Sequence, residues 1–168
     1  MSTRGFTFIE LLTAIALITV LMGIALPSMT RLIASVQIKS EAHRLLAAVS
    51  IARGSAMRRR ESVTLCPVSG SGTLLALCGG RFDQGFGVKT EIDGEWLQWY
   101  SASVGHIQIL NRIGSAPAMG SVTWDAKGFG NRNLTLSICH RGSDDNWALI
   151  LNRVGRPRLA RGWGRCPD

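Results

Sequence analysis

The sequence lacks the residue groupings on which most enzymes depend. Its histidines, His43, His106 and His140, are isolated from one another along the chain. No serine stands in the glycine-flanked pattern of a nucleophile elbow, and there is no glycine-rich phosphate loop. We therefore expect no catalytic residue and no cofactor.

Cysteine is scarce, and its spacing excludes the common zinc sites. None of the four cysteines, Cys66, Cys78, Cys139 and Cys166, forms a closely spaced pair with another. We therefore expect no metal site. Four cysteines allow three disulfide pairings, and free buried thiols are the further alternative.

Lys and Arg are absent between residues 5 and 30. The run 11–26 is almost entirely apolar and would rise roughly 24 Å as a helix, or about 30 Å with residues 6–10, which is enough to cross a bilayer core. Glu10 is the one charge inside this segment. A carboxylate in a membrane segment is costly, so Glu10 is a candidate functional residue.

The order of features differs from that of a secretory signal. A short basic leader, residues 1–5, ends directly before an aromatic residue, whereas a secretory signal has a small-residue cleavage site after its apolar run. We therefore expect the apolar helix to stay in the mature protein. A plain signal anchor with an incidental glutamate is the alternative.

These N-terminal residues resemble the class III leader of type IV pilins and type II secretion pseudopilins. The matching residues are Gly5, Phe6, Thr7, Phe8, Glu10 and Leu11, followed by the apolar run and Pro27. The resemblance implies that a prepilin peptidase cleaves between Gly5 and Phe6 and N-methylates Phe6. Glu10 lies four residues beyond that new amine, on the same helical face, and would pair with the amine of its own or a neighbouring subunit. Other major and minor pilins are the implied partners.

An amphipathic helix should continue the apolar run over residues 31–60. Its apolar residues recur at spacings near three and four, the pattern of a helix with one face on a core. They are Leu32, Val36, Leu45, Leu46, Val49, Ala52 and Ala56. The triplet 58–60 is all arginine and should end the helix, because basic side chains suit a helix C-terminus. The expected organisation is a leader (1–5), an assembly helix (6–30), this helix (31–60) and a β-rich domain (61–168).

From residue 61 onward the pattern favours short strands separated by turns. The expected strands are 62–67, 86–92, 96–101, 106–113, 121–125, 133–140 and 147–154. Asp93-Gly94 is a strong hairpin signal. We expect Asp144 and Asp145 to lie at another solvated hairpin tip. The fold class expected is α+β, a long N-terminal helix packed on antiparallel sheet.

The second half of the chain resembles the globular domain of the GspH/FimT branch of pilin-like proteins. The matching pieces are Val122-Thr123-Trp124-Asp125, Gly128, the strand 134–139 and the segment 149–158. With the leader and the helix, the resemblance covers essentially the whole chain. Since the leader exports this domain to where disulfides persist, we favour the bonds Cys66–Cys78 and Cys139–Cys166, because each closes a local loop.

The net charge is +8, carried by 16 Arg and 3 Lys. Five of the arginines are Arg153, Arg156, Arg158, Arg161 and Arg165. Because Pro157 holds the chain extended, Arg156 and Arg158 should point the same way, about 6.6 Å apart. Gly155 allows a tight turn before them.

Trp163 adds a flat surface between Arg161 and Arg165. Basic side chains interleaved with an aromatic suit a phosphate backbone with occasional base stacking. The alternatives are a surface kept soluble by charge, or one that binds acidic faces of neighbouring pilins.

The segment Gly155-Arg156-Pro157-Arg158 matches the Gly-Arg-x-Arg motif that is associated with DNA binding in FimT-type minor pilins. The resemblance therefore implies a non-enzymatic minor pilin that binds DNA, largely without sequence preference, during natural transformation. It would be a single-pass inner-membrane prepilin first and part of an extracellular or periplasmic pilus later. The alternatives are a structural pseudopilin of a type II secretion system and a pilus-assembly initiator.

We predict cleavage between Gly5 and Phe6, because a basic leader ending in glycine meets an aromatic start and an apolar helix. Mass spectrometry of protein recovered from membranes should find a methylated Phe6 at the amino terminus. An intact Met1, or a cut after Ala25, would contradict the leader assignment.

Overall fold

The computed structural model describes residues 7–68, 77–141 and 143–167. The expected cleavage site at Gly5 and Phe6, and most of the glycine-rich stretch before Cys78, lie outside this part of the chain. The described residues form one long helix and two antiparallel four-stranded sheets. This confirms the expected α+β class.

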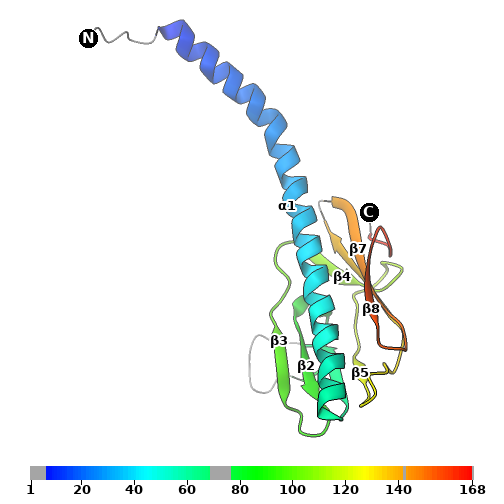
Figure 1. Ribbon diagram of the computed structural model, residues 1–168. Helices are drawn as coiled ribbons and strands as arrows, with labels where there is room; N and C mark the ends of the chain where they lie inside the picture. The colour runs from blue at the N-terminus through cyan, green and yellow to red at the C-terminus, as the bar shows by residue number, and fades with distance from the viewer. Residues whose placement is uncertain (1–6, 69–76, 142, 168) are drawn as a thin grey trace, which may run out of the picture.

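Helix α1 (Phe8–Arg59) is 52 residues long and passes Pro27 without a break. Its first half projects away from the domain, and its second half lies along it (Figure 1). The helix ends as expected at the arginine triplet, where Arg60 adopts a left-handed conformation with φ 57°. Arg59 pairs with Glu95 on a neighbouring loop at 2.9 Å, so the helix end is tied to the domain as well as solvated.

The first sheet has the order β3-β2-β1-β5. Its strands are β1 (Val63–Pro67), β2 (Phe86–Thr90), β3 (Trp96–Tyr100) and β5 (Val122–Trp124), with the 3-10 turn η1 (Phe82–Gln84) before β2. Strands β2 and β3 form the hairpin that Asp93-Gly94 predicts. Each of these strands lies within one of the ranges expected from the sequence.

The second sheet has the order β4-β6-β7-β8. Its strands are β4 (Ile107–Leu110), β6 (Leu134–His140), β7 (Ser143–Leu151) and β8 (Pro157–Arg161). Two expectations were wrong here. Asp144 and Asp145 belong to β7 and not to a hairpin tip, and β7 ends at Leu151, so that Pro157–Arg161 forms a separate edge strand.

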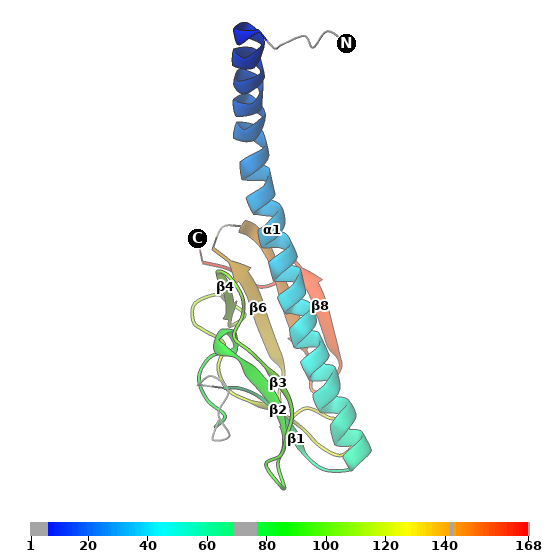
Figure 2. The ribbon, with the colours of Figure 1, turned by 90° about the vertical axis from the view of Figure 1, so that its left-hand side faces the viewer.

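The second half of α1 lies against both sheets (Figure 2). It packs there through a stripe of mostly small residues. Its fully or almost fully buried members are Ala34, Ile38, Ala42, Leu45, Ala48, Val49, Ala52 and Ala56. Leu32 and Val36, which we expected on this face, are each 58% exposed, because the stripe reaches this end of the helix through Ala34 and Ile38. Burial therefore begins at Ala34, so a soluble part starting at Arg31 contains every buried residue of the domain.

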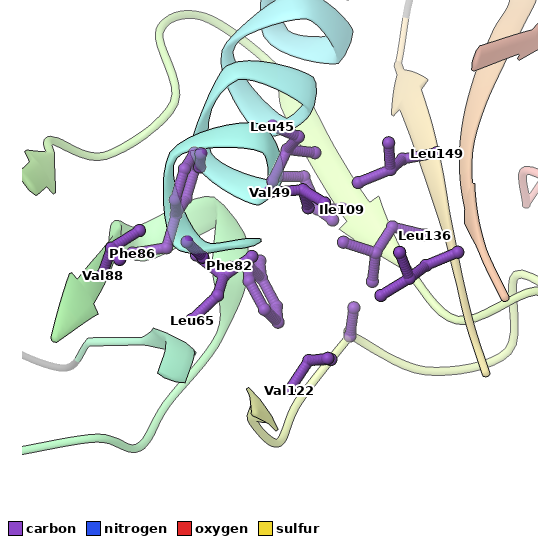
Figure 3. Close-up of a cluster of buried hydrophobic side chains, with 14 of the residues drawn as sticks. Leu45, Val49, Leu65, Phe82, Phe86, Val88, Ile109, Val122, Leu136 and Leu149 are labelled. Carbon is purple, nitrogen blue, oxygen red and sulfur yellow. The ribbon is translucent and has the colours of Figure 1, made fainter. Parts of the chain in front are cut away.

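The core lies between this stripe and the two sheets. Figure 3 shows Leu45 and Val49 of α1 with Phe86 and Val88 from the first sheet on one side and Leu136 and Leu149 from the second sheet on the other. Each fully buried Leu, Val or Phe contributes about 1.5–3 kcal/mol relative to exposure. The cluster therefore joins helix and sheets into one cooperative unit.

Two disulfide bonds staple the domain. Cys66 is bonded to Cys78, and Cys139 of β6 is bonded to Cys166 near the C-terminus. These are the two pairings that we favoured from the sequence because each closes a local loop. Each restricts the unfolded chain, and a bond of this kind contributes typically about 2–4 kcal/mol.

Gly155 is buried in a left-handed conformation with φ 78°. A Cβ at this position would overlap the Gly128 carbonyl oxygen and lie 3.1 Å from the indole of Trp124. The expected tight turn is therefore also a close packing contact between the β7–β8 turn and the core.

We predict that Gly155→Ala destabilises the domain by about 2–4 kcal/mol, the sum of a left-handed penalty and a steric clash. Gly94→Ala is the matched control, because Gly94 has φ 66° but open space around its Cβ position. Denaturant unfolding of the soluble part should show the larger loss for Gly155→Ala. Equal losses would mean that the close contacts of Gly155 with the Gly128 carbonyl and the Trp124 indole do not affect stability.

Candidate functional site

The turn between β7 and β8 is held by Asn152. The Gly155 N–H donates to the Asn152 carbonyl at 2.9 Å, and the Arg156 N–H donates to the Asn152 side-chain oxygen at 3.2 Å. Pro157 then opens β8 opposite Leu151. An asparagine that bonds its own turn in this way directs the chain back along β7.

Alternation along β8 gives its residues two different surroundings. Leu159 lies opposite the buried Leu149 and packs against the core beneath α1. Arg158 lies opposite Ile150 and points to the other side of the sheet, called here the outer face. Arg156, two residues earlier, is exposed like Arg158.

The C-terminal segment, residues 162–167, crosses this outer face. The Gly162 N–H donates to the Asn146 carbonyl at 3.0 Å, and the Asn146 side-chain amide donates to the Gly164 carbonyl at 3.3 Å. Gly164 lies directly over Ser137 of β6, where a Cβ would overlap the serine hydroxyl. Figure 2 shows the segment running from the end of β8 toward β6, where the bond between Cys139 and Cys166 holds it.

Trp163 brings together two arginines from distant parts of the chain. The Arg158 guanidinium carbon lies 5.8 Å from the centroid of its ring system, and that of Arg112 lies 6.0 Å from it. Cation–π contacts of this length are attractive. Arg112 follows β4, and its carbonyl accepts a hydrogen bond from the Arg165 N–H at 3.2 Å. The C-terminal segment thus attaches to both edges of the sheet.

Sequence reasoning missed Arg112. The sequence does place Arg112 near the end of the expected strand 106–113. No pattern of neighbouring residues, however, indicates that this strand lies beside the C-terminal segment. We define the outer-face site as Arg112, Arg158, Trp163 and Arg165, which are joined by the contacts above, together with Arg156, which is exposed two residues before Arg158. Within the described part of the chain, none of its four arginines forms an ion pair.

Arg161 does not belong to the outer-face site, contrary to expectation. It lies three residues beyond Arg158, which places it on the opposite side of β8, and its guanidinium donates two hydrogen bonds to Asp145, at 2.9 and 3.2 Å. The hydrogen bond to Asp145 raises the pKa of Arg161 above its ordinary value. Its charge is therefore balanced by a carboxylate.

Arg153 is exposed in the β7–β8 turn, where its N–H donates to the Asn133 side chain at 2.8 Å. It has no contact with Trp163 among the interactions of the described residues. Arg153 therefore contributes charge near the outer-face site without being held in it.

Glu10 is exposed in the first part of α1. Over residues 7–68, 77–141 and 143–167, no cation forms an ion pair with it. The helix around it is long and apolar enough to cross a membrane. Glu10 and the outer-face site thus lie in separate parts of the molecule.

The described residues contain no group of three or more His, Cys, Asp or Glu that could hold a metal ion. His106, directly before β4, and His140, at the end of β6, come together with ring centroids 6.0 Å apart.

Known proteins resemble the chain at the level of family and fold. The model of the family described as type II transport protein GspH matches residues 41–155, and the prokaryotic N-terminal methylation motif matches residues 1–26. A search of the curated proteins finds no relative by sequence.

Two solved structures share the fold. The type IV minor pilin FimU of Pseudomonas aeruginosa aligns with a TM-score of 0.55 and 17% identity over 73% of this chain and 87% of FimU. The minor pseudopilin EpsH from the type 2 secretion system of Vibrio cholerae aligns with a TM-score of 0.53 and 16% identity over 74% of this chain and 96% of EpsH. Because the GspH model covers more than half of the sequence, the chain belongs to the GspH family of type IV pilin-like proteins.

Proposed function

We propose that this chain is a minor type IV pilin of the FimT type that binds DNA through its outer-face site during natural transformation. It is made as an inner-membrane prepilin, is processed by a prepilin peptidase and joins other pilins in a pilus. The observation that carries the proposal is the outer-face site itself. Contacts with Trp163 and along the backbone bring together Arg112, Arg158 and Arg165 from three chain segments, and Arg156 is exposed two residues before Arg158. None of these arginines has a carboxylate partner in the described structure.

The chemistry of this site suits a phosphate backbone. Arginine presents a flat fork of donors that matches phosphate oxygens. Contacts to phosphates carry little sequence information, so binding should be largely independent of sequence. A site with so few cations supports affinities on the order of micromolar at low salt. Many subunits in one filament would strengthen this binding through effective concentration.

The disulfide between Cys139 and Cys166 supports the same proposal. It fixes the segment that carries Trp163 and Arg165 to the central strand β6. A segment held in place before binding loses less conformational entropy when a ligand arrives. The bond therefore favours binding by a segment that would otherwise be a mobile terminus.

A structural role in a secretion system is the second candidate function. It is favoured by the family description, type II transport protein GspH, and by the fold shared with EpsH. A pilus-assembly initiator would be a related role. Both require only contacts with other pilins, so neither predicts DNA affinity at the outer-face site.

We predict that Arg156→Gln with Arg158→Gln lowers DNA affinity of the soluble part by about tenfold or more, and lowers the log–log salt slope by about two units, because each arginine neutralises one phosphate. Fluorescence anisotropy at matched salt measures both quantities. The fold should be intact, because both side chains are exposed.

Arg161→Gln is the matched control, since this arginine is already paired with Asp145 and should change affinity little. Replacing Arg58, Arg59 and Arg60 together should also matter less than the double change. If the double variant binds like the wild type, the DNA proposal fails and the structural role becomes the better account.

We predict that Glu10→Gln inserts into the membrane normally but enters filaments poorly. The change keeps the shape of the side chain and removes the charge that would pair with a Phe6 amine. Quantifying the variant in membranes and in sheared filaments separates the two steps. Equal incorporation of variant and wild type would exclude the pairing role.

A further inference from the structure

A hollow of about 440 Å³ lies beside the indole of Trp163. Its lining comes from the residues after β4 and from the C-terminal segment: Arg112, Ile113, Gly162, Trp163, Gly164 and Arg165. Arg158 contacts the indole but does not line the hollow. The hollow therefore opens on the Arg112 side of the ring.

The lining combines apolar and cationic side chains. Ile113 is 64% exposed and Trp163 is 44% exposed, although both are large and apolar. Arg112 and Arg165 border the same space, and the two glycines contribute backbone without side chains. A ligand that fits all of these groups has a flat, weakly polar ring joined to an anionic group.

A nucleotide has that combination. Its base can stack on an aromatic face or on a guanidinium plane, and its phosphates can bind arginine forks. In a duplex the bases are stacked inside and cannot enter a pocket beside the backbone without unpairing. A base site next to a phosphate site therefore distinguishes single-stranded from double-stranded DNA.

We propose that the hollow binds one unpaired nucleotide, with its base against Trp163 and Ile113 and its phosphates on Arg112 and Arg165. The strand continues from there toward Arg156 and Arg158. This inference rests on the proposed function and adds to it that the outer-face site prefers single-stranded segments or frayed ends over closed duplex.

The test compares three probes with the full chain in a neutral detergent. They are a short oligothymidine, a strand of equal length in which abasic units replace the nucleotides, and a duplex of equal phosphate number whose ends are closed by non-nucleotide linkers. The abasic strand keeps the phosphates and removes the bases. We expect the oligothymidine to bind about tenfold more tightly than the abasic strand, the effect of one stacked base.

Two variants separate the base contact from the phosphate contact. Trp163→Leu should bring the oligothymidine and abasic affinities together while the salt slope stays close to that of the wild type. Arg112→Gln should lower the slope by about one unit and keep the preference for bases. Phe129→Leu is the control, since Phe129 is an exposed aromatic outside the hollow, and should change neither quantity. Ile113→Thr tests the base contact independently at an exposed position.

The outcomes are distinguishable. Equal wild-type affinity for all three probes overturns the nucleotide hollow and leaves DNA binding in place. A base preference that survives both Trp163→Leu and Ile113→Thr also overturns it. Absence of wild-type binding to every probe rejects the proposed function and this inference together.

Discussion

The packing of one helix face against two sheets is the contact on which the rest of this structure depends. Five of the eight members of the buried stripe on α1 are alanine, and their small side chains allow both sheets to approach the same helix closely. The sheets do not need to pair with each other, because each buries one face on α1. The same helix continues beyond the domain as an exposed apolar segment that is long enough to cross a membrane. Its length therefore sets the position of the domain relative to that segment.

Because α1 covers one face of the second sheet, the other face is available to the C-terminal segment. Leu136 and Ile138 of β6 point into the core, whereas the intervening Ser137 and the following Cys139 meet Gly164 and Cys166. The central strand thus connects the core to the outer-face site. On the face of the sheet that α1 covers, the helix also carries a buried charge: Glu41 is 4% exposed and forms an ion pair with Arg44 at 2.8 Å. That burial was not apparent from the sequence, because the Ser103 hydroxyl that donates a hydrogen bond to Glu41 is far away in the chain.

Patterns of residues that are neighbours in the sequence allowed the helix and one hairpin to be predicted. The apolar run, the arginine triplet and Asp93-Gly94 mark α1 and one hairpin through residues that are neighbours in sequence. The turn expected at Asp144 and Asp145 was wrong because β7 already begins at Ser143, which is paired with His140 of β6, and because Asp145 forms an ion pair with Arg161 of β8.

The composition of the outer-face site depends on contacts between residues that are distant in the sequence. Arg112 could not be placed at the site, since the order β4-β6-β7-β8 joins segments that no local pattern relates. Arg161, in contrast, could have been excluded by counting along β8, because an odd spacing from Arg158 reverses the side of the strand.

The central claim is that DNA binds the outer face of the second sheet. Backbone amide chemical shifts of the labelled soluble part, followed during a DNA titration, test it most directly. The account predicts that the largest changes occur at Arg112, at Gly155, Arg156 and Arg158, and at 162–166, with little change at 58–60. Changes confined to the arginine triplet at the end of α1, or spread evenly over all arginines, would contradict it.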